Sequence, residues 1–254
     1  MTQPILYSAP GEDYIKHIAR CLDLFDIIFP LWEDTFKRIF SITCNDDIKN
    51  LLKEMITFHD LGKLTKRWQE NLGTNKKLPS HTTIGAAYLY KRFTRDDGLG
   101  DLKNAIVFAV AIHHTDSGLL GDNIERPDVQ AIIDGIVDNE GKIKWASGVE
   151  NLSGEVSTKE LNELVIEDLK NMARGLRTWA RSGGIIDQHR KRIQASLAHH
   201  ILKLCDISAA TEREEYKKHK DENYYGGWLM CKNISEYVKN IRNHVASKQE
   251  EVSI

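Results

Sequence analysis

Apolar residues recur at three- and four-residue intervals through most of the chain, whereas runs that alternate between apolar and polar residues are scarce. The first pattern is typical of amphipathic helices and the second of half-buried strands, so the chain is predicted to be all-α. Only five prolines interrupt the helical pattern. The expected helices cover 11–28, 31–42, 46–59, 63–71, 81–94, 101–114, 126–136, 158–180, 187–216 and 227–247.

One stretch, 119–159, has weaker helical periodicity and contains turn residues such as Gly121, Asp122 and Gly141. Such residues interrupt helices, so this stretch is predicted to be a loop insertion. No internal repeat and no Gly-, Ser- or Pro-rich linker divides the sequence. We therefore expect a single domain over 1–254, in which 217–254 forms a C-terminal helical extension.

The charges of the chain nearly balance, with 35 Lys and Arg against 37 Asp and Glu and a formal net charge of −2. This balance provides no overall field that would draw the protein onto nucleic acid, so any nucleic-acid site must be local. The sequence shows no signal peptide and no apolar segment near the ~20 residues needed to cross a bilayer, so we expect a cytoplasmic protein without membrane contact. A G-x-x-x-x-G-K-[ST] loop and a G-x-G-x-x-G fingerprint are both missing, which argues against an ATP-driven motor.

A histidine and an aspartate stand side by side at the end of an apolar helix, where the run FHDLGKLTKRWQ contains His59 and Asp60. Imidazole and carboxylate are both good ligands for a divalent transition metal, although a chain with ten histidines often contains such a pair by chance. Adjacent helical residues point about 100° apart, so a histidine pair at a helix end reaches one cavity more easily than a pair in mid-helix. The further candidates are His17 on the first helix, His81 at a helix start, His113 and His114 at a helix end, and Asp206 on a long late helix.

The order His, His-Asp, His, His-His, Asp resembles that of the HD superfamily of metal-dependent phosphohydrolases. Its details are similar to the HD nucleases of type I CRISPR interference systems, and the resemblance spans about 10–216. The central motif of that branch is roughly H-D-x-G-K followed by an aromatic residue and Gln, matched here by His59, Asp60, Gly62, Lys63, Trp68 and Gln69. The next element is a His followed by a helix of small residues, matched by His81 with Gly85, Ala86 and Ala87.

The resemblance implies an HD helical bundle with a metal site at its centre. A pair of divalent cations in such a site can activate water and stabilise both the attacking and the leaving oxygen of a phosphodiester. Ligation rich in histidine favours Mn, Ni, Co or Fe over Mg, although availability and geometry decide which metal is bound. One cation would be held by His17, His59, Asp60 and Asp206, and the second by Asp60, His81, His113 and His114, with Asp60 bridging the two.

Basic and aromatic residues follow the central motif. Lys63 lies four residues after His59, about one helical turn, so its ammonium can meet a phosphate near the metals; a solvated surface lysine is the alternative. Asp60 and Lys63 are therefore the predicted catalytic residues. Together with Lys63, the residues Lys66 and Arg67 could line a groove for a single strand, and Trp68 could stack on a base, although charge runs are usually solvated faces and a tryptophan also fits a core.

By resemblance, the chain is a stand-alone nuclease that cuts single-stranded DNA in CRISPR antiviral defence, with endonuclease and 3′ to 5′ exonuclease action. The family commonly carries its HD unit fused to a helicase. Helicase motifs are missing here, which implies a separate helicase subunit and recruitment to an RNA-guided surveillance complex. Two alternatives stay open: an HD phosphohydrolase acting on nucleotides or cyclic nucleotides, because a fold does not decide a substrate, and a non-catalytic helical subunit that binds partners.

Overall fold

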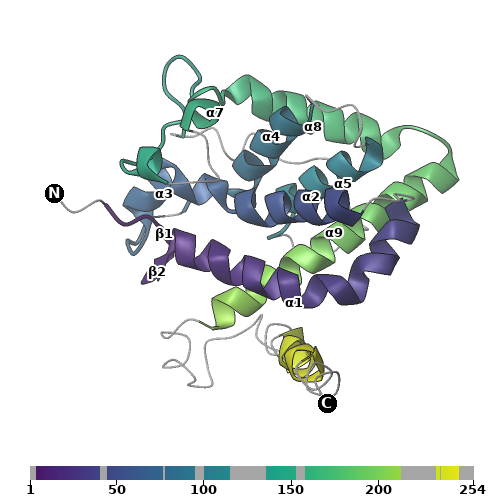
Figure 1. The fold of residues 1–254 in the computed structure, drawn as a ribbon. Coiled ribbons are helices and arrows are strands. Elements are labelled where there is room, and N and C mark those ends of the chain that lie inside the picture. The colour runs from purple at the N-terminus through teal and green to yellow at the C-terminus, as the bar shows by residue number, and fades with distance from the viewer. Residues whose placement is uncertain are drawn as a thin grey trace.

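The computed structural model describes residues 4–40, 45–76, 78–94, 100–114, 136–152, 158–212, 233–234 and 236–245. These residues are mostly helical, which confirms the all-α prediction (Figure 1). Most of the predicted helix 126–136 and most of the predicted extension 217–254 lie outside the described residues, although 236–245 is helical as expected. Among the described residues no helix combines the length and the apolarity needed to cross a membrane.

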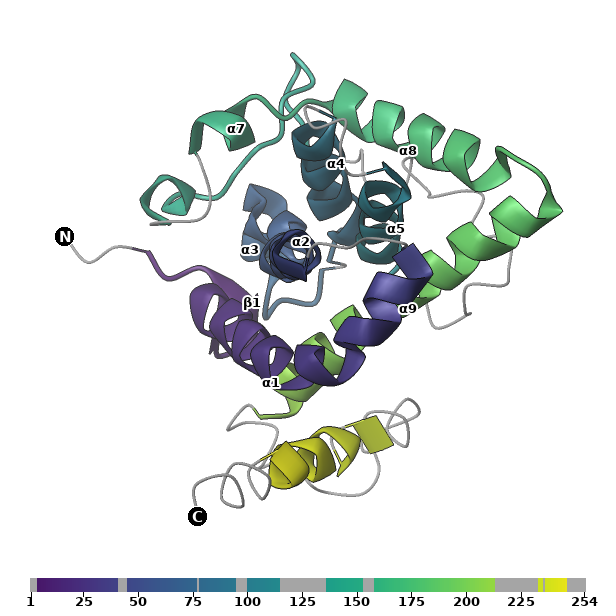
Figure 2. The ribbon, with the colours of Figure 1, turned by 45° about the vertical axis from the view of Figure 1, so that its right-hand side comes forward.

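Three long helices frame three shorter ones. Figure 2 shows α2 (Asn45–Phe58), α4 (Thr82–Phe93) and α5 (Gly100–Ala111) inside a frame of α1, α9 and α8. The framing helices are α1 (Tyr14–Phe40), α8 (Ile166–Arg181) and α9 (Ile185–Thr211), and α9 packs against both α1 and α5. The consequence is that segments far apart in the sequence meet at the centre of the bundle.

The burial pattern of each helix explains its place. In α1 the residues Ile18, Cys21, Phe25 and Ile28 are buried at three- and four-residue intervals, so this helix buries one stripe and exposes the other side. In α5 every residue of 105–111 is buried, as expected of a helix that is surrounded by others.

The first long helix runs through a proline. The sequence predicted two helices, 11–28 and 31–42, but α1 is continuous, with Pro30 inside it. A proline lacks the N–H that would bond to the carbonyl four residues earlier and its ring crowds that turn, so a helix usually bends there. The ribbon of α1 does change direction along its length (Figure 1), and Pro30 and Asp26 are both exposed, so the carbonyl left without its partner lies on the solvent side.

A second difference concerns the predicted helix 158–180, which is divided into α7 (Thr158–Asn162) and α8. Between them the chain turns and Val165 is extended. Ile143 N–H donates to Leu164 O at 3.3 Å, and Ile166 N–H donates to Gly141 O at 2.8 Å. The Asp168 carboxylate accepts from Val165 N–H at 2.9 Å and so begins α8. The helix is interrupted because the backbone of 164–166 forms hydrogen bonds with 141–143.

Part of the predicted insertion, 136–152, is described and contains turns, isolated bridges and the short 3-10 helix η4 (Val149–Asn151). It packs on the segment that follows α2, which consists of the 3-10 helix η1 (Leu61–Leu64) and α3 (Lys66–Asn71). Lys66 N–H donates to Lys144 O at 2.8 Å, and Ala146 N–H donates to Leu64 O at 2.9 Å. This loop therefore supports the segment that carries the H-D-x-G-K motif.

A short antiparallel hairpin precedes the first helix, in place of the predicted helix start at 11. Its strands are β1 (Tyr7–Ala9) and β2 (Glu12–Asp13), and Gly11 allows the tight turn with a φ of +72°. Because α1 starts at Tyr14, directly after β2, the hairpin fixes the direction in which the first helical turn points.

Candidate metal centre

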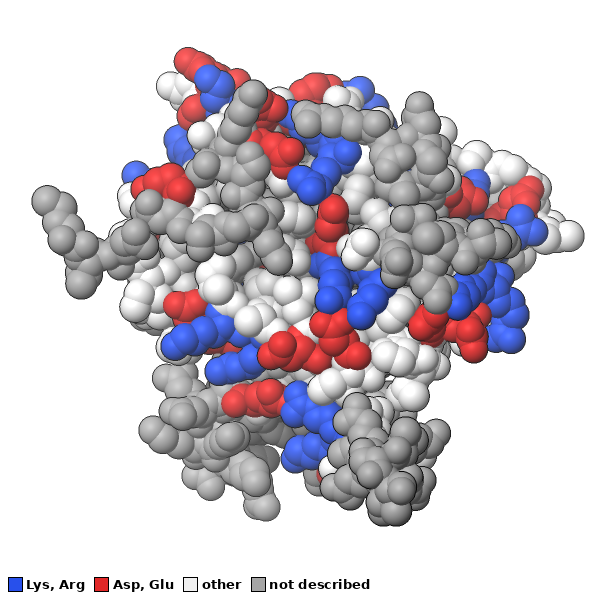
Figure 3. Space-filling view, in the orientation of Figure 1, with Lys and Arg blue, Asp and Glu red and all other residues white. Residues whose placement is uncertain are grey.

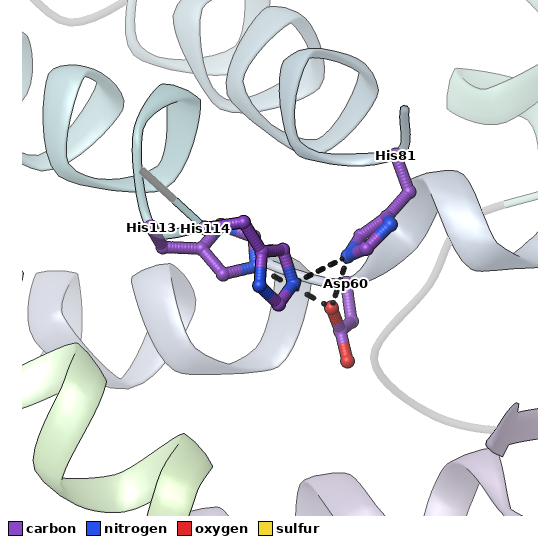
Figure 4. A group of neighbouring side chains, drawn as sticks. All are labelled: Asp60, His81, His113 and His114. Atoms are coloured by element: carbon purple, nitrogen blue, oxygen red, sulfur yellow. Dashed lines mark hydrogen bonds and ion pairs between the residues drawn. The ribbon is translucent and has the colours of Figure 1, made fainter. Parts of the chain in front are cut away.

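Residues from five parts of the chain meet at the centre of the bundle. All seven predicted ligands fall into two groups, in each of which one potential ligand atom per residue lies within 4.8 Å of the others. The first, here termed the carboxylate-rich group, consists of His17, His59, Asp60 and Asp206. The second, the histidine-rich group, consists of Asp60, His81, His113 and His114 (Figure 4).

Helix ends supply most of these side chains. His17 lies in the first turn of α1, His81 directly precedes α4, and the His113–His114 pair follows α5 after one residue, Ile112, as the sequence predicted. His59 and Asp60 come just after α2 ends, and Asp206 lies within α9. Helix ends let neighbouring residues converge on one point, which a straight helix does not allow.

Asp60 belongs to both groups, and its two oxygens face different ones. Oδ2 lies 3.4 Å from His17 Nε2 and 3.5 Å from His59 Nε2. Oδ1 lies 3.2 Å from His81 Nε2 and 3.5 Å from His113 Nε2 (Figure 4). This is the arrangement of a carboxylate that can bridge two cations.

The outer members close each group. Asp206 Oδ1 lies 3.3 Å from His17 Nε2 and 3.7 Å from His59 Nε2. On the other side His114 Nε2 lies 2.8 Å from His81 Nε2. Each group thus presents several ligand atoms toward one small volume.

The hydrogen bonds of three imidazoles orient them as ligands. His59 Nδ1 lies 2.6 Å from Ile56 O and His113 Nδ1 lies 2.7 Å from Val110 O. A carbonyl oxygen only accepts, so these Nδ1 atoms carry the hydrogen and leave the Nε2 lone pairs pointing into the centre. His17 has the same orientation, with Nδ1 3.2 Å from a carboxylate oxygen of Glu12. Metal-binding histidines are usually held in this way.

Three polar atoms at the centre are buried without a hydrogen-bond partner: His59 Nε2, Asp60 Oδ1 and His113 Nε2. Leaving a buried polar group unpaired costs about 1–3 kcal/mol, so such atoms call for an explanation. All three are ligand atoms, and they point at the two volumes that the groups enclose. The donor set of imidazoles and carboxylates therefore fits divalent metal ions.

The electrostatics of the centre keep its carboxylates ionised. Burial by itself raises the pKa of Asp60, but the Lys63 ammonium, 2.6 Å from Oδ2, and the neighbouring imidazoles hold that pKa well below its usual range. Burial also opposes the charge of Asp206, but the imidazoles of His17 and His59, whose Nε2 atoms lie 3.3 and 3.7 Å from Oδ1, hold its pKa well below the usual range. The ionised carboxylate is the form that binds metal.

His17 of the carboxylate-rich group and His81 of the histidine-rich group differ in charge. Burial opposes protonation of His17, but hydrogen bonds with Asp206, Cys21 and Glu12 raise its pKa to about 12. Burial lowers the pKa of His81 to about 4, and the partly opposing attraction of Asp60 does not compensate. Without a cation, His17 is therefore charged at neutral pH and His81 is neutral.

Two glycines and a threonine bring His81 to the centre. A side-chain carbon at Gly62 would collide with the backbone of His81, and one at Gly85 would collide with the carbonyl of Phe58. Both positions need glycine because backbones pass there too closely for a side chain. Thr82 Oγ1 donates to Ala111 O at 3.0 Å, which joins the start of α4 to the end of α5.

The residues predicted to contact nucleic acid have different surroundings. The Lys63 side chain is 12% exposed and reaches the centre, where it pairs with Asp60. Lys66 is exposed beside Glu70, and Arg67 is partly exposed. Trp68 is only 3% exposed, and its ring lies edge-on against His81. Its burial favours the alternative of core packing over stacking on a base.

The sequence did not single out Glu12, which contacts His17. No motif covers it, and an acidic residue near a helix start is common because it favours the helix dipole. The only signal in the sequence is an acid five residues before a candidate ligand, which is too frequent to carry weight alone.

Comparison with solved structures finds a similar protein, the CRISPR-associated Cas3 HD domain protein MJ0384 from Methanocaldococcus jannaschii. The two share 18% sequence identity with a TM-score of 0.55, and the match covers 78% of this chain and 100% of that chain. No protein-family model matches the sequence, and no relative is found among curated proteins. The structural likeness shows that this chain has the fold of an HD domain, which confirms the fold predicted from its histidines and aspartates.

Proposed function

We propose that this HD-fold chain is a metal-dependent nuclease that hydrolyses phosphodiester bonds of single-stranded DNA in CRISPR antiviral defence. The observation that carries the proposal is the Asp60 carboxylate, whose two oxygens face two separate sets of imidazole nitrogens. The similarity of the fold to a CRISPR-associated Cas3 HD domain protein supports the biological setting.

The seven clustered residues would hold two divalent cations, one in each group. When bound, such a pair supplies a nucleophile from water at neutral pH and stabilises charge on the attacking and leaving oxygens of a phosphodiester. Asp60 would set the separation between the two, since it is the one residue common to both groups. The six other side chains would complete the two sets of ligands.

Lys63 would have two partners in turn. It now lies 2.6 Å from Asp60 Oδ2, an oxygen that a cation in the carboxylate-rich group would also contact. With a cation held by the carboxylate-rich group, Asp60 would no longer need Lys63 for charge balance, and the Lys63 ammonium would be free to meet a phosphate oxygen. We assign Lys63 the stabilisation of the negative charge that develops on the phosphate during cleavage.

Contacts to the strand would come from a few basic residues near the centre. On the described part of the face in Figure 3, basic and acidic side chains are interspersed and do not form a broad field of one sign. This agrees with the formal net charge of −2. We assign strand contacts to Lys63, Lys66 and Arg67, and leave out Trp68 because it is buried.

We propose that the protein acts in the cytoplasm together with two partners. A separate helicase subunit would deliver single-stranded DNA, and an RNA-guided surveillance complex would recruit both proteins to the target. The cations would be drawn from Mn, Ni, Co, Fe and Mg, with the histidine content favouring the first four.

The experiment that tests this function compares substrates over a panel of those metals. Metal-stripped protein is incubated with end-labelled single strands, circular single strands, duplexes, mononucleotides and cyclic nucleotides. We expect metal-dependent cleavage of linear and circular single strands and no hydrolysis of mononucleotides or cyclic nucleotides. The opposite preference would favour a nucleotide phosphohydrolase, and metal binding without any hydrolysis would favour a partner-binding subunit.

The position of the label resolves the cleavage mode. Endonuclease action opens the circles, and 3′ to 5′ exonuclease action shortens strands labelled at the 5′ end one nucleotide at a time. Asp60→Asn serves as the inactive control, so that activity shared by both preparations is assigned to a contaminant.

A further inference from the structure

We infer that Glu12 is a positioning residue for the carboxylate-rich group, because it holds the Nδ1 side of His17 so that Nε2 points toward Asp60 and Asp206. This inference rests on the proposed metal centre and assigns a role to a residue outside the seven clustered side chains. It makes the N-terminal hairpin a part of the site.

The Glu12 carboxylate is buried and fully engaged. Its side chain is 4% exposed, and its Oε1 lies 3.2 Å from His17 Nδ1 and 3.3 Å from an Arg20 nitrogen. Its Oε2 accepts a hydrogen bond from Ser8 Oγ at 2.9 Å. Burying a carboxylate is costly unless it is paired. These three partners compensate for the burial of the Glu12 carboxylate.

The imidazole of His17 lies between two carboxylate environments. Nδ1 faces Glu12, whereas Nε2 lies 3.3 Å from Asp206 and 3.4 Å from Asp60. Glu12 can only accept at Nδ1 when it is ionised, so it keeps the hydrogen on that nitrogen and leaves Nε2 for the centre. A carboxylate in this place also makes the ring a stronger ligand.

Glu12 distinguishes His17 from the two other oriented imidazoles. His59 and His113 donate to the carbonyls of Ile56 and Val110, which belong to the last turns of their own helices. His17 stands in the first turn of α1, where carbonyls accept the N–H groups of the helix itself, whereas the last carbonyls of a helix have no such partner. An ionised acceptor also bonds more strongly than a neutral carbonyl. The hairpin thus supplies the hydrogen-bond acceptor for His17 Nδ1 that α1 itself does not provide.

Local hydrogen bonds fix the register between Glu12 and His17. Tyr14 N–H donates to Leu6 O at 2.8 Å, which closes the hairpin over the helix start. Asp13 Oδ1 accepts from Lys16 N–H at 3.1 Å and caps α1. The first turn of the helix therefore follows Glu12 directly, and His17 comes around to face it.

Gln69 joins this hairpin to the segment that follows Asp60. Its amide nitrogen donates to Tyr7 O at 2.8 Å and to Lys63 O at 2.7 Å, and its Oε1 accepts from Tyr7 N–H at 3.1 Å. The glutamine of the central motif is thus a structural clamp between β1 and η1. Because of these hydrogen bonds, the positions of Glu12 and Asp60 relative to each other are fixed, with His17 between them.

The test measures the binding of Co²⁺ to metal-free protein by calorimetry and by the visible absorbance of the ion. Each group is isolated first: Asp206→Asn leaves the histidine-rich group, and His81→Ala leaves the carboxylate-rich group. Adding Glu12→Ala to the His81→Ala protein should weaken Co²⁺ binding by roughly 10- to 100-fold, the range seen when the hydrogen-bond partner of a metal ligand is removed. The visible absorbance band of the bound ion should also change. Adding Glu12→Ala to the Asp206→Asn protein should leave the affinity unchanged.

Two further variants separate positioning from folding. Glu12→Gln keeps the size and can still accept from Nδ1, so it should lose less affinity than Glu12→Ala. Glu54→Gln removes a partly buried carboxylate that pairs with Arg92 at 2.9 Å, away from the centre, and should leave Co²⁺ binding unchanged. Circular dichroism of each metal-free protein checks that it is folded, and Glu12→Gln carries the test if Glu12→Ala is not.

The outcomes distinguish this inference from the function on which it rests. Wild-type protein that binds two Co²⁺ while folded Glu12 variants bind with unchanged affinity would overturn the role of Glu12 and leave the metal centre standing. An equal loss in both single-group backgrounds would also overturn it, because a general structural defect would explain that result. Wild-type protein that binds no Co²⁺ would overturn both.

Discussion

The two groups that share Asp60 differ in charge, in burial and in the elements that carry them. The carboxylate-rich group has two carboxylates and is buried apart from the Asp206 side chain, which is 12% exposed. The histidine-rich group has one carboxylate, and its His114 is exposed. Two members of the first lie in the longest helices of the described chain, whereas the histidines of the second all lie just outside helix ends.

This difference suggests a division of labour within one centre. In the carboxylate-rich group a cation has to displace the proton of His17 and the ammonium of Lys63, but it gains two negative ligands. In the histidine-rich group a cation meets a single shared carboxylate, the imidazoles of His81 and His114, whose pKa values burial lowers, and one exposed member, His114. We expect the first group to hold its cation tightly and the second to exchange its cation and to face the substrate.

Removing the shared carboxylate should have the largest effect. Asp60→Asn keeps the shape of the side chain but takes a ligand from both groups at once. Cleavage should fall by more than the roughly 10²- to 10³-fold that is typical for loss of one electrostatic group. Circular dichroism should show unchanged helix content, and an active variant would remove Asp60 from its bridging role.

Removing one ligand from one side should divide the centre. Asp206→Asn and His81→Ala are each expected to lose one equivalent of bound metal and roughly 10²-fold in cleavage rate, because the other group stays intact. Metal analysis after dialysis measures the stoichiometry. Loss of both equivalents in either variant would show that the two groups bind metal as one unit and are not separable sites.

The pH dependence of metal binding should differ between the same two variants. His17 keeps a proton below about pH 12 in the metal-free protein, so a cation must displace it, and affinity should rise by about tenfold per pH unit in His81→Ala. The pKa of His81 is about 4, so this ligand is already deprotonated at neutral pH and the affinity of Asp206→Asn for metal should depend much less on pH. Titrations between about pH 6 and 8 test this; equal slopes would contradict it.

A glycine variant should disturb only the histidine-rich side. In Gly62→Ala the new carbon collides with the backbone of His81, which must move away from Asp60. We expect a loss of about 1–3 kcal/mol in the free energy of unfolding, and weaker metal binding in the Asp206→Asn background alone. Gly184→Ala is the control, since a carbon there meets nothing closer than 3.9 Å. Equal effects in both backgrounds would refute the assignment.

The smallest effect is expected at the exposed lysine near the centre. Lys66 is 60% exposed and lies 3.8 Å from Glu70, so Lys66→Ala should change the free energy of unfolding by less than about 1 kcal/mol. Its affinity for single-stranded DNA should fall a few-fold, with the salt dependence reduced by about 0.7 for one lost phosphate contact. Lys170→Ala, in a similar pair with Glu167 on α8, is the control, and an equal change there would argue against a specific contact.

The fold was predictable where one pattern decided the outcome. Helical periodicity located α2, α4, α5 and α9 to within a few residues because each buries a continuous apolar stripe or surface. The prediction of a break between two helices at Pro30 was wrong, because packing along α1 outweighs the loss of one hydrogen bond on its exposed side. The break at 163–165 was missed because backbone pairing with 141–143 decides it, and periodicity does not report such a contact.

The residues of the candidate site could be proposed from the sequence, but the contacts that hold them in place could not. The seven clustered residues were chosen by type and order, and the structure brings all of them together. The hydrogen bond from His17 to Glu12, the clamp by Gln69 and the close approach at Gly62 depend on distances between elements. The burial of Trp68 likewise depends on the packing of α3 against His81, which the sequence pattern alone left open.

The central claim is that two cations lie on opposite sides of one carboxylate. Crystals grown with Mn²⁺ and measured at a wavelength where manganese scatters anomalously test it directly. We predict two anomalous peaks, one next to Asp60 Oδ2 among His17, His59 and Asp206, and one next to Oδ1 among His81, His113 and His114. Peaks only at other places, or none in contact with Asp60, would contradict the account.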